Sequence, residues 1–292
     1  MAFFDFLSES IAIDLGTANT LIIHNDKVVV DSPSIVAIDK RSEKIIAVGT
    51  EASLMQGKTH ENIKTVRPLK DGVIADFNAS EQMISLLIKS IPALKKRFFT
   101  PALKMVICIP SGITEVEMRA VRESAERVNG KEVYLIHEPM AAAIGIGVDI
   151  MQPKGNMVVD IGGGTTEIAV MSLGGVVYSE SLRVAGDAMD NALKDYMREE
   201  YNLMIGDSTS EKIKKDIGTA IPTNNNTYAV KGRDLRSGTP KEVNISEEDT
   251  AEALNPILKD IVSSIKKALE NTPPELSADL VDMGLTLTGG GS

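Results

Sequence analysis

The pattern of apolar and polar positions along the chain predicts buried strands that alternate with amphipathic helices. Short apolar runs bounded by polar residues indicate strands at 11–13, 44–48, 105–109, 133–136 and 157–159. Apolar residues recur at helical spacing between positions 83 and 91, and we expect Ser80 to cap this helix. The alternation predicts an α/β fold with a largely parallel sheet, in which sites gather at the carboxyl ends of the strands.

Further helices are predicted by their starting residues. Thr114 with Glu117 and Ser208 with Glu211 have the spacing of a capping box, in which two side chains satisfy the first backbone N–H groups of a helix. Ser246 precedes a long apolar stripe at helical spacing, so we expect it to cap a third helix.

The stretch 157–167 combines the residues that a phosphate-binding turn needs. An apolar strand ends at Asp160, and Gly162, Gly163, Gly164 and Thr165 follow. Glycines allow positive φ and bring backbone N–H groups close to a ligand, while Asp160 supplies a hard oxygen suited to Mg²⁺ or its waters. A tight glycine turn without a ligand explains this stretch about equally well, so it leaves both interpretations open.

The start of the chain repeats this plan, and the repeat favours a ligand. An apolar strand leads into the residues Asp14, Gly16, Thr17, Ala18 and Asn19. β-hairpins are predicted after both copies, with turns at 25–26 and 174–175. A third glycine run consists of Gly289, Gly290 and Gly291. Because chance turns rarely reproduce their flanks, we expect two similar domains that face one nucleotide.

Composition narrows the classes of protein that fit. A length of 292 residues suits two domains, each with its own core. A net charge of −10 argues against a general role with nucleic acid, because phosphate backbones must be met by clustered Lys and Arg. The single cysteine, Cys108, allows no disulfide within the chain and fits a reducing compartment. Neither an apolar run near the ~18 residues of a membrane span nor a signal peptide is evident, so we expect a cytoplasmic protein.

Four motifs resemble those of one superfamily. They are DLGTANT at 14–20, RPLKDGVIAD at 67–76, HEPMAAAIG at 137–145 and TPPEL at 272–276. With the glycine turns, they resemble the actin, heat-shock chaperone ATPase and sugar kinase superfamily. Within it, the chain is much more similar to the MreB family of bacterial actins, the rod shape-determining proteins, and the resemblance covers nearly the whole chain.

The resemblance implies an actin-like ATPase fold of two lobes, each with an RNase H-like core and a smaller inserted subdomain. We expect the first lobe at 1–145 with its small subdomain at about 33–65, and the second at 146–292 with its small subdomain at about 182–245. Relatives continue past the third glycine run with further helices. The resemblance therefore implies that the C-terminal part of the first lobe is missing after Ser292.

The same resemblance implies binding of ATP and Mg²⁺. The residues expected at the nucleotide are Gly16, Thr17, Ala18, Asn19, Gly162, Gly163, Gly164, Thr165, Gly289, Gly290 and Gly291. We expect Asp14 and Asp160, both at strand ends, to hold the metal through water, although a carboxylate after a strand is often only a helix cap.

Other residues take their expected roles from the resemblance alone. Glu138 and Thr165 would position the water that attacks the γ-phosphate. Glu211, Lys212 and Lys214 would lie beside the adenosine, whereas from the residues alone they indicate a solvated charged helix.

Two patches could reach a lipid surface. Phe3, Phe4, Phe6 and Leu7 form the first, and Phe98 and Phe99, behind the cations at 95–97, form the second. The residues alone favour a packed or frayed tail for the first patch, and rings folded under a helix remain open for the second. The resemblance favours attachment to the inner face of the cytoplasmic membrane.

We therefore expect a cytoskeletal ATPase that hydrolyses ATP, polymerises with itself on the membrane and guides cell-wall synthesis and rod shape. Its further partners would be membrane proteins of the cell-wall synthesis machinery. Two alternatives stay open: a sugar kinase of the same superfamily, and a structural filament protein that binds ATP without significant hydrolysis. A chaperone ATPase is disfavoured because the chain has no peptide-binding domain.

Overall fold

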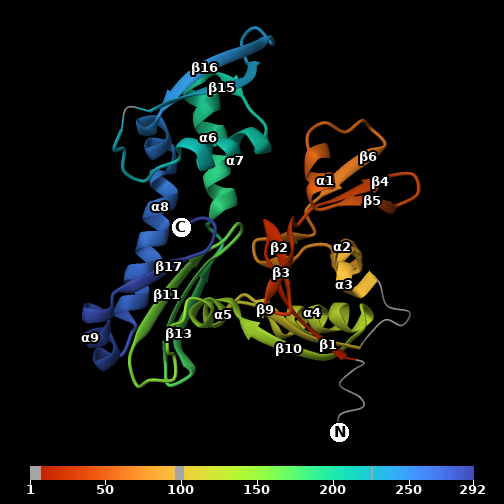
Figure 1. Cartoon of the computed structure of the whole chain (residues 1–292). Helices are drawn as coiled ribbons and strands as arrows, with labels where there is room; N and C mark the ends of the chain where they lie inside the picture. Colours follow the sequence, from red (N-terminus) through yellow and green to blue (C-terminus); the bar gives the residue numbers. More distant parts are fainter. Residues whose placement is uncertain (1–7, 96–101, 225) are drawn as a thin grey trace. The chain divides into compact units, whose positions relative to one another are not determined.

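The computed structural model describes residues 8–95, 102–224 and 226–292, and Figure 1 shows the course of the chain. Packing divides the chain into two compact units. Unit 1 consists of Met1–Arg183 and Ala268–Ser292, and unit 2 of Val184–Lys267. The division into lobes at 145/146, with the small subdomains assigned to them, stays a prediction.

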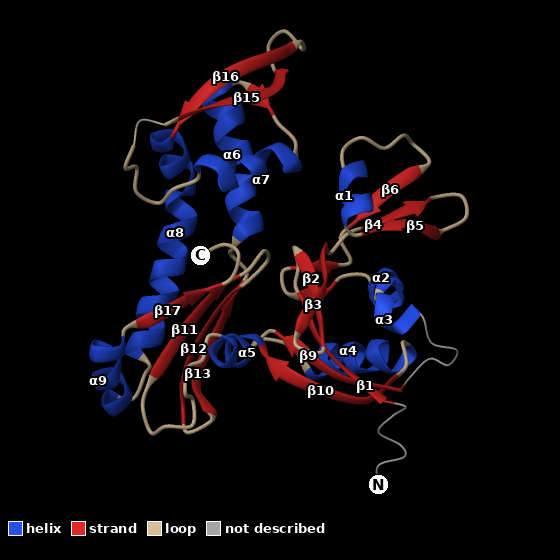
Figure 2. Cartoon of the chain, in the orientation of Figure 1, coloured by secondary structure: helices blue, strands red, loops and turns tan. Residues whose placement is uncertain are grey.

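Unit 1 contains a mixed sheet in the order β10-β9-β1-β2-β3 (Figure 2). Its strands are β1 (Ser8–Leu15), β2 (Asn19–His24), β3 (Lys27–Pro33), β9 (Ala102–Ile109) and β10 (Gly130–His137). The pairs β1/β9 and β9/β10 are parallel, whereas β1/β2 and β2/β3 are antiparallel. The prediction of a largely parallel sheet is wrong, because consecutive hairpins supply half of the strand pairs.

Helices α2 (Phe77–Ser90) and α4 (Glu115–Arg127) share a core with this sheet, and α3 (Pro92–Lys95) follows α2. The core is formed by β-branched and other apolar side chains of the sheet and by the predicted helical stripe, including Ile11, Ile13, Met105, Met83, Leu87 and Val121. The strand and helix periods read from the sequence are therefore confirmed here.

The caps of these two helices differ in how well they are predicted. The capping box is confirmed, since the Thr114 N–H donates to Glu117 Oε2 at 2.8 Å and the Glu117 N–H donates to Thr114 Oγ1 at 3.3 Å. The predicted Ser80 cap is wrong. Asp76 caps α2 by accepting from the Ala79 N–H at 3.0 Å, so the helix begins a turn earlier and Ser80 is buried within it.

A second sheet of unit 1 has the order β13-β12-β11-β17. Its strands are β11 (Asn156–Ile161), β12 (Thr166–Ser172), β13 (Gly175–Leu182) and β17 (Leu285–Thr288). Helix α5 (Glu138–Gly145) contacts strands of both sheets, and its Ala143 packs against Val158, Ala169 and Met171. Helix α9 (Pro274–Met283) packs on β11. The first residue of α5 is thus held where the two sheets meet.

The two predicted hairpins both form, with one change. Asn25 and Asp26 have φ of 51° and 57°, as a two-residue turn between strands of this twist requires. In the second hairpin Ser172 pairs with Gly175, so the turn is Leu173-Gly174 and the predicted turn at 174–175 is wrong by one residue. Leu173 tolerates a φ of 52° because its N–H donates to Gln152 O at 3.2 Å and the Gly174 N–H donates to Ile150 O at 2.7 Å.

The segment between β3 and α2 forms a small sheet of its own. Its order is β5-β4-β6, with strands β4 (Val36–Asp39), β5 (Lys44–Val48) and β6 (Ile63–Val66) and helix α1 (Thr50–Met55). Ile35, Ala37, Ala47 and Ala52 form its core. The short hairpin β7 (Leu69–Lys70) and β8 (Val73–Ile74) follows. The strand predicted at 44–48 is confirmed.

Unit 2 combines helices with a three-stranded sheet in the order β14-β15-β16. Its elements are α6 (Gly186–Tyr201), β14 (Leu203–Met204), α7 (Asp207–Ile217), β15 (Thr227–Asp234), β16 (Pro240–Ser246) and α8 (Glu247–Glu270), which runs on into unit 1. The Ser246 cap is confirmed by its Oγ, which accepts from the Asp249 N–H at 3.2 Å. The predicted Ser208–Glu211 cap is wrong, because α7 begins at Asp207 after Gly206 and has no side-chain cap.

None of the helices in the described ranges combines the length and the apolar character needed to cross a membrane.

Candidate functional site

Carboxylates gather at the ends of strands in unit 1. Asp14 lies near the end of β1, Glu138 directly follows β10 and Asp160 lies near the end of β11. Burial, and then the charge of Asp160, raises the pKa of Asp14 to about 6. Burial also raises the pKa of Asp160, while the neighbouring Thr288 hydroxyl counters part of the shift. The two predicted metal ligands are therefore near enough to repel each other.

Glu138 experiences the largest of these effects. Burial, followed by the charges of Glu167, Asp14 and Asp160, raises its pKa to about 8. Carboxylates crowded in this way are stabilised by a cation. Within the described part of the chain, no three His, Cys, Asp or Glu side chains group tightly enough to hold a metal ion by themselves. The arrangement fits Mg²⁺, which binds through one or two carboxylates and takes its other ligands from water and phosphate.

The two predicted phosphate-binding turns lie against each other. A Cβ placed on Gly163 would lie 2.6 Å from Ala18 Cβ, and one placed on Gly164 would lie 2.6 Å from Thr17 Oγ1. Only glycine allows backbones to approach this closely. The structure thus brings together two turns that the sequence places far apart.

The turn between β7 and β8 joins the same site. The Gly72 N–H donates to Thr17 Oγ1 at 3.1 Å, and a Cβ on Gly72 would lie 2.7 Å from Thr165 Cγ2. Gly72 has a φ of +76°, which favours glycine there independently of the space. Thr165 and Thr17 are both buried.

The third glycine run lies beside Asp160. The Gly291 N–H donates to Ile161 O at 2.8 Å. A Cβ on Gly289, whose φ is +90°, would lie 2.5 Å from Asp160 Oδ1, whereas a Cβ on Gly290 would meet nothing within 4 Å. Parallel pairing of β17 with β11 produces this arrangement, because it brings both strand ends to one edge.

Three of the predicted site residues lie in unit 2, on α7. Lys214 Nζ lies 2.9 Å from Asp190 Oδ1 and donates to Gly186 O at 2.9 Å, so it ties α7 to α6. Glu211 pairs with Lys215 at 2.6 Å, and Lys212 is exposed. The lipid patches predicted at Phe3, Phe4, Phe6, Leu7, Phe98 and Phe99 lie outside the described residues.

Sequence reasoning missed the role of Glu167. Only 1% of this residue is exposed, yet it lies in a strand whose other buried residues are mostly apolar. Its Oε2 accepts from the Ser111 N–H at 3.0 Å, and its Oε1 accepts from Ser181 Oγ at 2.6 Å. A carboxylate inside a predicted buried strand was the signal that could have identified it.

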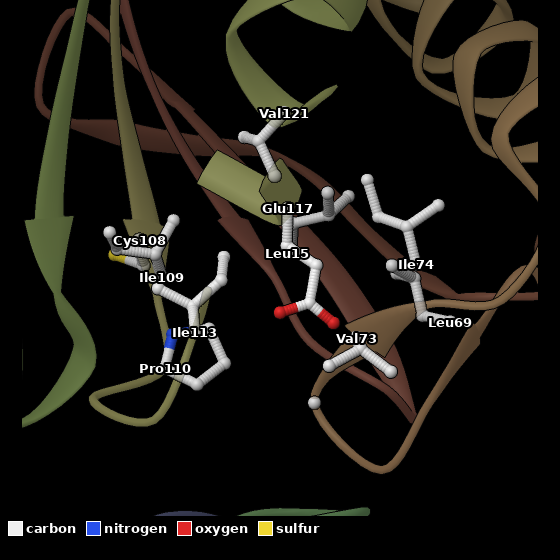
Figure 3. Close-up of a pocket in the computed structure, with 11 residues that line it drawn as sticks. Leu15, Leu69, Val73, Ile74, Cys108, Ile109, Pro110, Ile113, Glu117 and Val121 are labelled. Carbon is white, nitrogen blue, oxygen red and sulfur yellow. The ribbon is translucent and has the colours of Figure 1, made fainter. Parts of the chain in front are cut away.

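A largely apolar pocket lies between the ends of β1 and β9 and helix α4 (Figure 3). Leu15, Ile74, Pro110 and Val121 contribute to its lining, and Glu117 is the charged residue among the side chains that line it. Cys108 also lines it. Burial, and then the charges of Asp14, Glu138 and Asp160, raises the pKa of this thiol to about 12, which disfavours a nucleophilic role.

Paired glycine turns on two mixed sheets, with an aspartate near the end of the strand that precedes each turn, define an actin-like fold. MreB5 of Spiroplasma citri bound to AMPPNP has this fold, with a TM-score of 0.91 and 39% identity over 97% of this chain and 85% of that chain. The MamK double helical filament matches with a TM-score of 0.80 at 22% identity over 97% of this chain and 86% of that chain, which supports the fold alone.

The family follows from sequence. The family model described as MreB/Mbl protein matches residues 8–292. The cell shape-determining protein Mbl of Bacillus subtilis is 48% identical over 98% of this chain and 85% of its own length. The cell shape-determining protein MreB of Escherichia coli K12 is 46% identical over 98% of this chain and 83% of its own length. The chain belongs to the MreB/Mbl family.

Proposed function

We propose that the protein is an actin-like ATPase that binds ATP with Mg²⁺, hydrolyses it and assembles into filaments that determine cell shape. The observation that carries the proposal is the contact of the two glycine turns beside the paired carboxylates Asp14 and Asp160. The solved structures of MreB5 of Spiroplasma citri bound to AMPPNP and to ADP support it, since that protein is 38–39% identical to this chain.

The glycine turns and the carboxylates would bind different parts of Mg-ATP. Backbone N–H groups of 16–19 and 162–165, with 289–291, would bind the phosphates, and Asp14 and Asp160 would hold the metal. Bound Mg²⁺ would offset the negative charge of the phosphates. Glu211, Lys212 and Lys214 are proposed to contact the adenosine, with Lys214 oriented by Asp190.

Glu138 and Thr165 would orient the attacking water. Helix α5 fixes Glu138 at the junction of the two sheets, and Thr165 lies in the second turn against Gly72. A carboxyl whose pKa is raised towards 8 can accept and release a proton near neutral pH, as general acid–base catalysis requires. A carboxylate at this place would also bind water without chemistry, which is the role expected of a non-hydrolysing filament protein.

Phosphate release separates these possibilities. We expect Glu138→Ala to bind ATP but to release phosphate ~10²–10⁴ times more slowly than wild type, measured with and without assembly. Glu132→Ala, which removes an exposed carboxylate from β10, is the matched control and should behave as wild type. Binding of ATP without phosphate release by assembled wild type would favour the structural filament protein. Phosphate transfer to an added sugar would favour the kinase.

We further propose that filaments attach to the inner face of the cytoplasmic membrane and work there with membrane proteins of the cell-wall synthesis machinery. Family membership supports this proposal, as do the apolar patches at 3–7 and 98–99. One patch would bind weakly, and rows of patches on a filament would bind far more tightly by avidity. Deletion of residues 1–7 and Phe98→Ser/Phe99→Ser should each reduce ATP-dependent co-sedimentation with liposomes. Equal lipid-dependent pelleting of all three proteins would argue against both patches.

A further inference from the structure

The buried carboxylate of Glu167 connects the two sheets of unit 1. It lies in β12 of the second sheet and accepts from the Ser111 N–H at 3.0 Å, in the loop that follows β9 of the first sheet. Its other oxygen accepts from Ser181 Oγ, on β13, at 2.6 Å. A Cβ on Gly112 would lie 3.1 Å from Ser181 Cβ, so the loop and the hairpin are packed together here.

The register of the sheet places Glu167 among the site residues. In the antiparallel ladder Glu167 is directly opposite Asp160 on β11 and opposite Ser181 on β13. Directly opposed residues project from the same face of a sheet. Of the neighbouring charges that raise the pKa of Glu138, that of Glu167 has the largest effect, ahead of Asp14 and Asp160. One carboxylate therefore touches the Ser111 loop, faces Asp160 and acts on Glu138.

Stability alone gives little reason for a carboxylate at this position. Like charges directly opposite in a sheet are destabilising, and a buried charge is costly unless it is paired. Among the described residues Glu167 forms no salt bridge, and its two hydrogen bonds are what offsets the cost of burying it. A group that costs stability and lies against reacting residues is more often retained for function than for folding.

We propose that Glu167 is a positioning residue for ATP hydrolysis, which holds the Ser111 loop and the β12–β13 hairpin so that Glu138 and Thr165 face the same water. The inference rests on the proposed ATPase function. Glu167 acts through its two hydrogen bonds. Its loss should therefore lower the rate of hydrolysis while the turns continue to bind nucleotide.

Substitutions can separate the two hydrogen bonds of Glu167, here called the bridge, from its negative charge. In Glu167→Gln the amide oxygen can accept from the Ser111 N–H while the amide NH₂ donates to Ser181 Oγ, so the bridge remains without its charge. Glu167→Ala removes the bridge. Ser181→Ala removes one of its two bonds, and Ser179→Ala, on an exposed position of the same strand, is the matched control.

The test measures single-turnover phosphate release, affinity for ATP by calorimetry and thermal unfolding on the full chain. We expect Glu167→Ala to lower the rate roughly 10–100-fold with its affinity for ATP nearly unchanged, and Ser181→Ala to lower it less. Glu167→Gln should restore most of the rate, and Ser179→Ala should match wild type. A purely structural role would not produce this split between rate and affinity or the rescue by Gln.

Three outcomes would overturn the inference. The first is a wild-type rate of phosphate release in both Glu167→Ala and Ser181→Ala. The second is a loss of affinity for ATP in these variants that is as large as their loss of rate. The third applies if Glu167→Ala does not fold, because Ser181→Ala is then compared with Ser179→Ala. Equal rates of phosphate release in these two variants would show that the hydrogen bonds of Glu167 take no part in the mechanism. Failure of the proposed function is recognised separately, because then folded wild type binds ATP but releases no phosphate, and the inference falls with it.

Discussion

Glu138 should make the nucleotide-free protein less stable as pH rises. Burial, with the charges of Glu167, Asp14 and Asp160, raises its pKa from 4.5 to about 8, so in this interval the folded chain keeps a proton that the unfolded chain releases. Stability rises with pH only where the unfolded state binds more protons. Here the folded state binds more, so the stability is lost from pH 4.5 upward, with the full loss reached above pH 8.

Linkage gives the size of this effect. With pKa values of 4.5 unfolded and about 8 folded, the proton that only the folded chain keeps lowers the unfolding free energy by about 2 kcal/mol at pH 6 and by about 4 kcal/mol at pH 8, relative to acidic pH. Glu138→Gln removes the ionisation while keeping the shape of the side chain. Its advantage over wild type should therefore grow by about 2 kcal/mol, or on the order of 5 °C in Tm, between pH 6 and pH 8.

Thermal unfolding followed by circular dichroism measures this difference in EDTA and without nucleotide. Both pH values lie above the sequence pI of about 5.0, which limits precipitation. Glu132→Gln, which makes the same substitution at an exposed carboxylate of β10, is the matched control. A difference between Glu138→Gln and wild type that stays the same at both pH values would refute the reasoning, because it would mean that Glu138 is ionised at both.

Two further predictions concern the binding of nucleotide. Asp14→Ala and Asp160→Ala should each weaken binding of Mg-ATP in calorimetry, by roughly 10-fold or more, because each removes a charge that is proposed to hold the metal; unchanged affinity in both would exclude this metal site. Gly163→Ala places a Cβ against the first turn and should weaken nucleotide binding, whereas Gly145→Ala has open space and should bind as wild type does. Equal affinity of the two glycine variants would mean that the turns need not touch for binding.

Local signals in the sequence predicted a turn or a helix cap correctly where no neighbouring residue could take the same position. The turn at Asn25-Asp26 and the capping box at Thr114 formed as predicted. Ser80 failed because Asp76 caps the helix a turn earlier, and the second hairpin turn moved by one residue because the Leu173 N–H bonds to a distant carbonyl. These choices depend on tertiary partners that local patterns do not contain.

The sequence predicted those parts of the candidate site that occur as repeated segments. The two glycine turns and their aspartates could be found by comparing segments, and the structure places both turns in contact. Glu167 escaped because its partners are the backbone of Ser111 and the hydroxyl of Ser181, neither of which belongs to a recognisable motif. Their meeting depends on the packing of two sheets around α5.

The carboxylates around Cys108 also have a practical consequence for spectroscopy. With its pKa raised to about 12, only about one thiol in 10⁵ is ionised at pH 7, and it is the thiolate that attacks a maleimide reagent. Since Cys108 is the only cysteine in the chain, a second cysteine introduced on an exposed loop would react far faster. Fluorophores or spin labels can thus be attached at chosen places for assembly experiments while the native thiol, and the strand end that it occupies, stays intact.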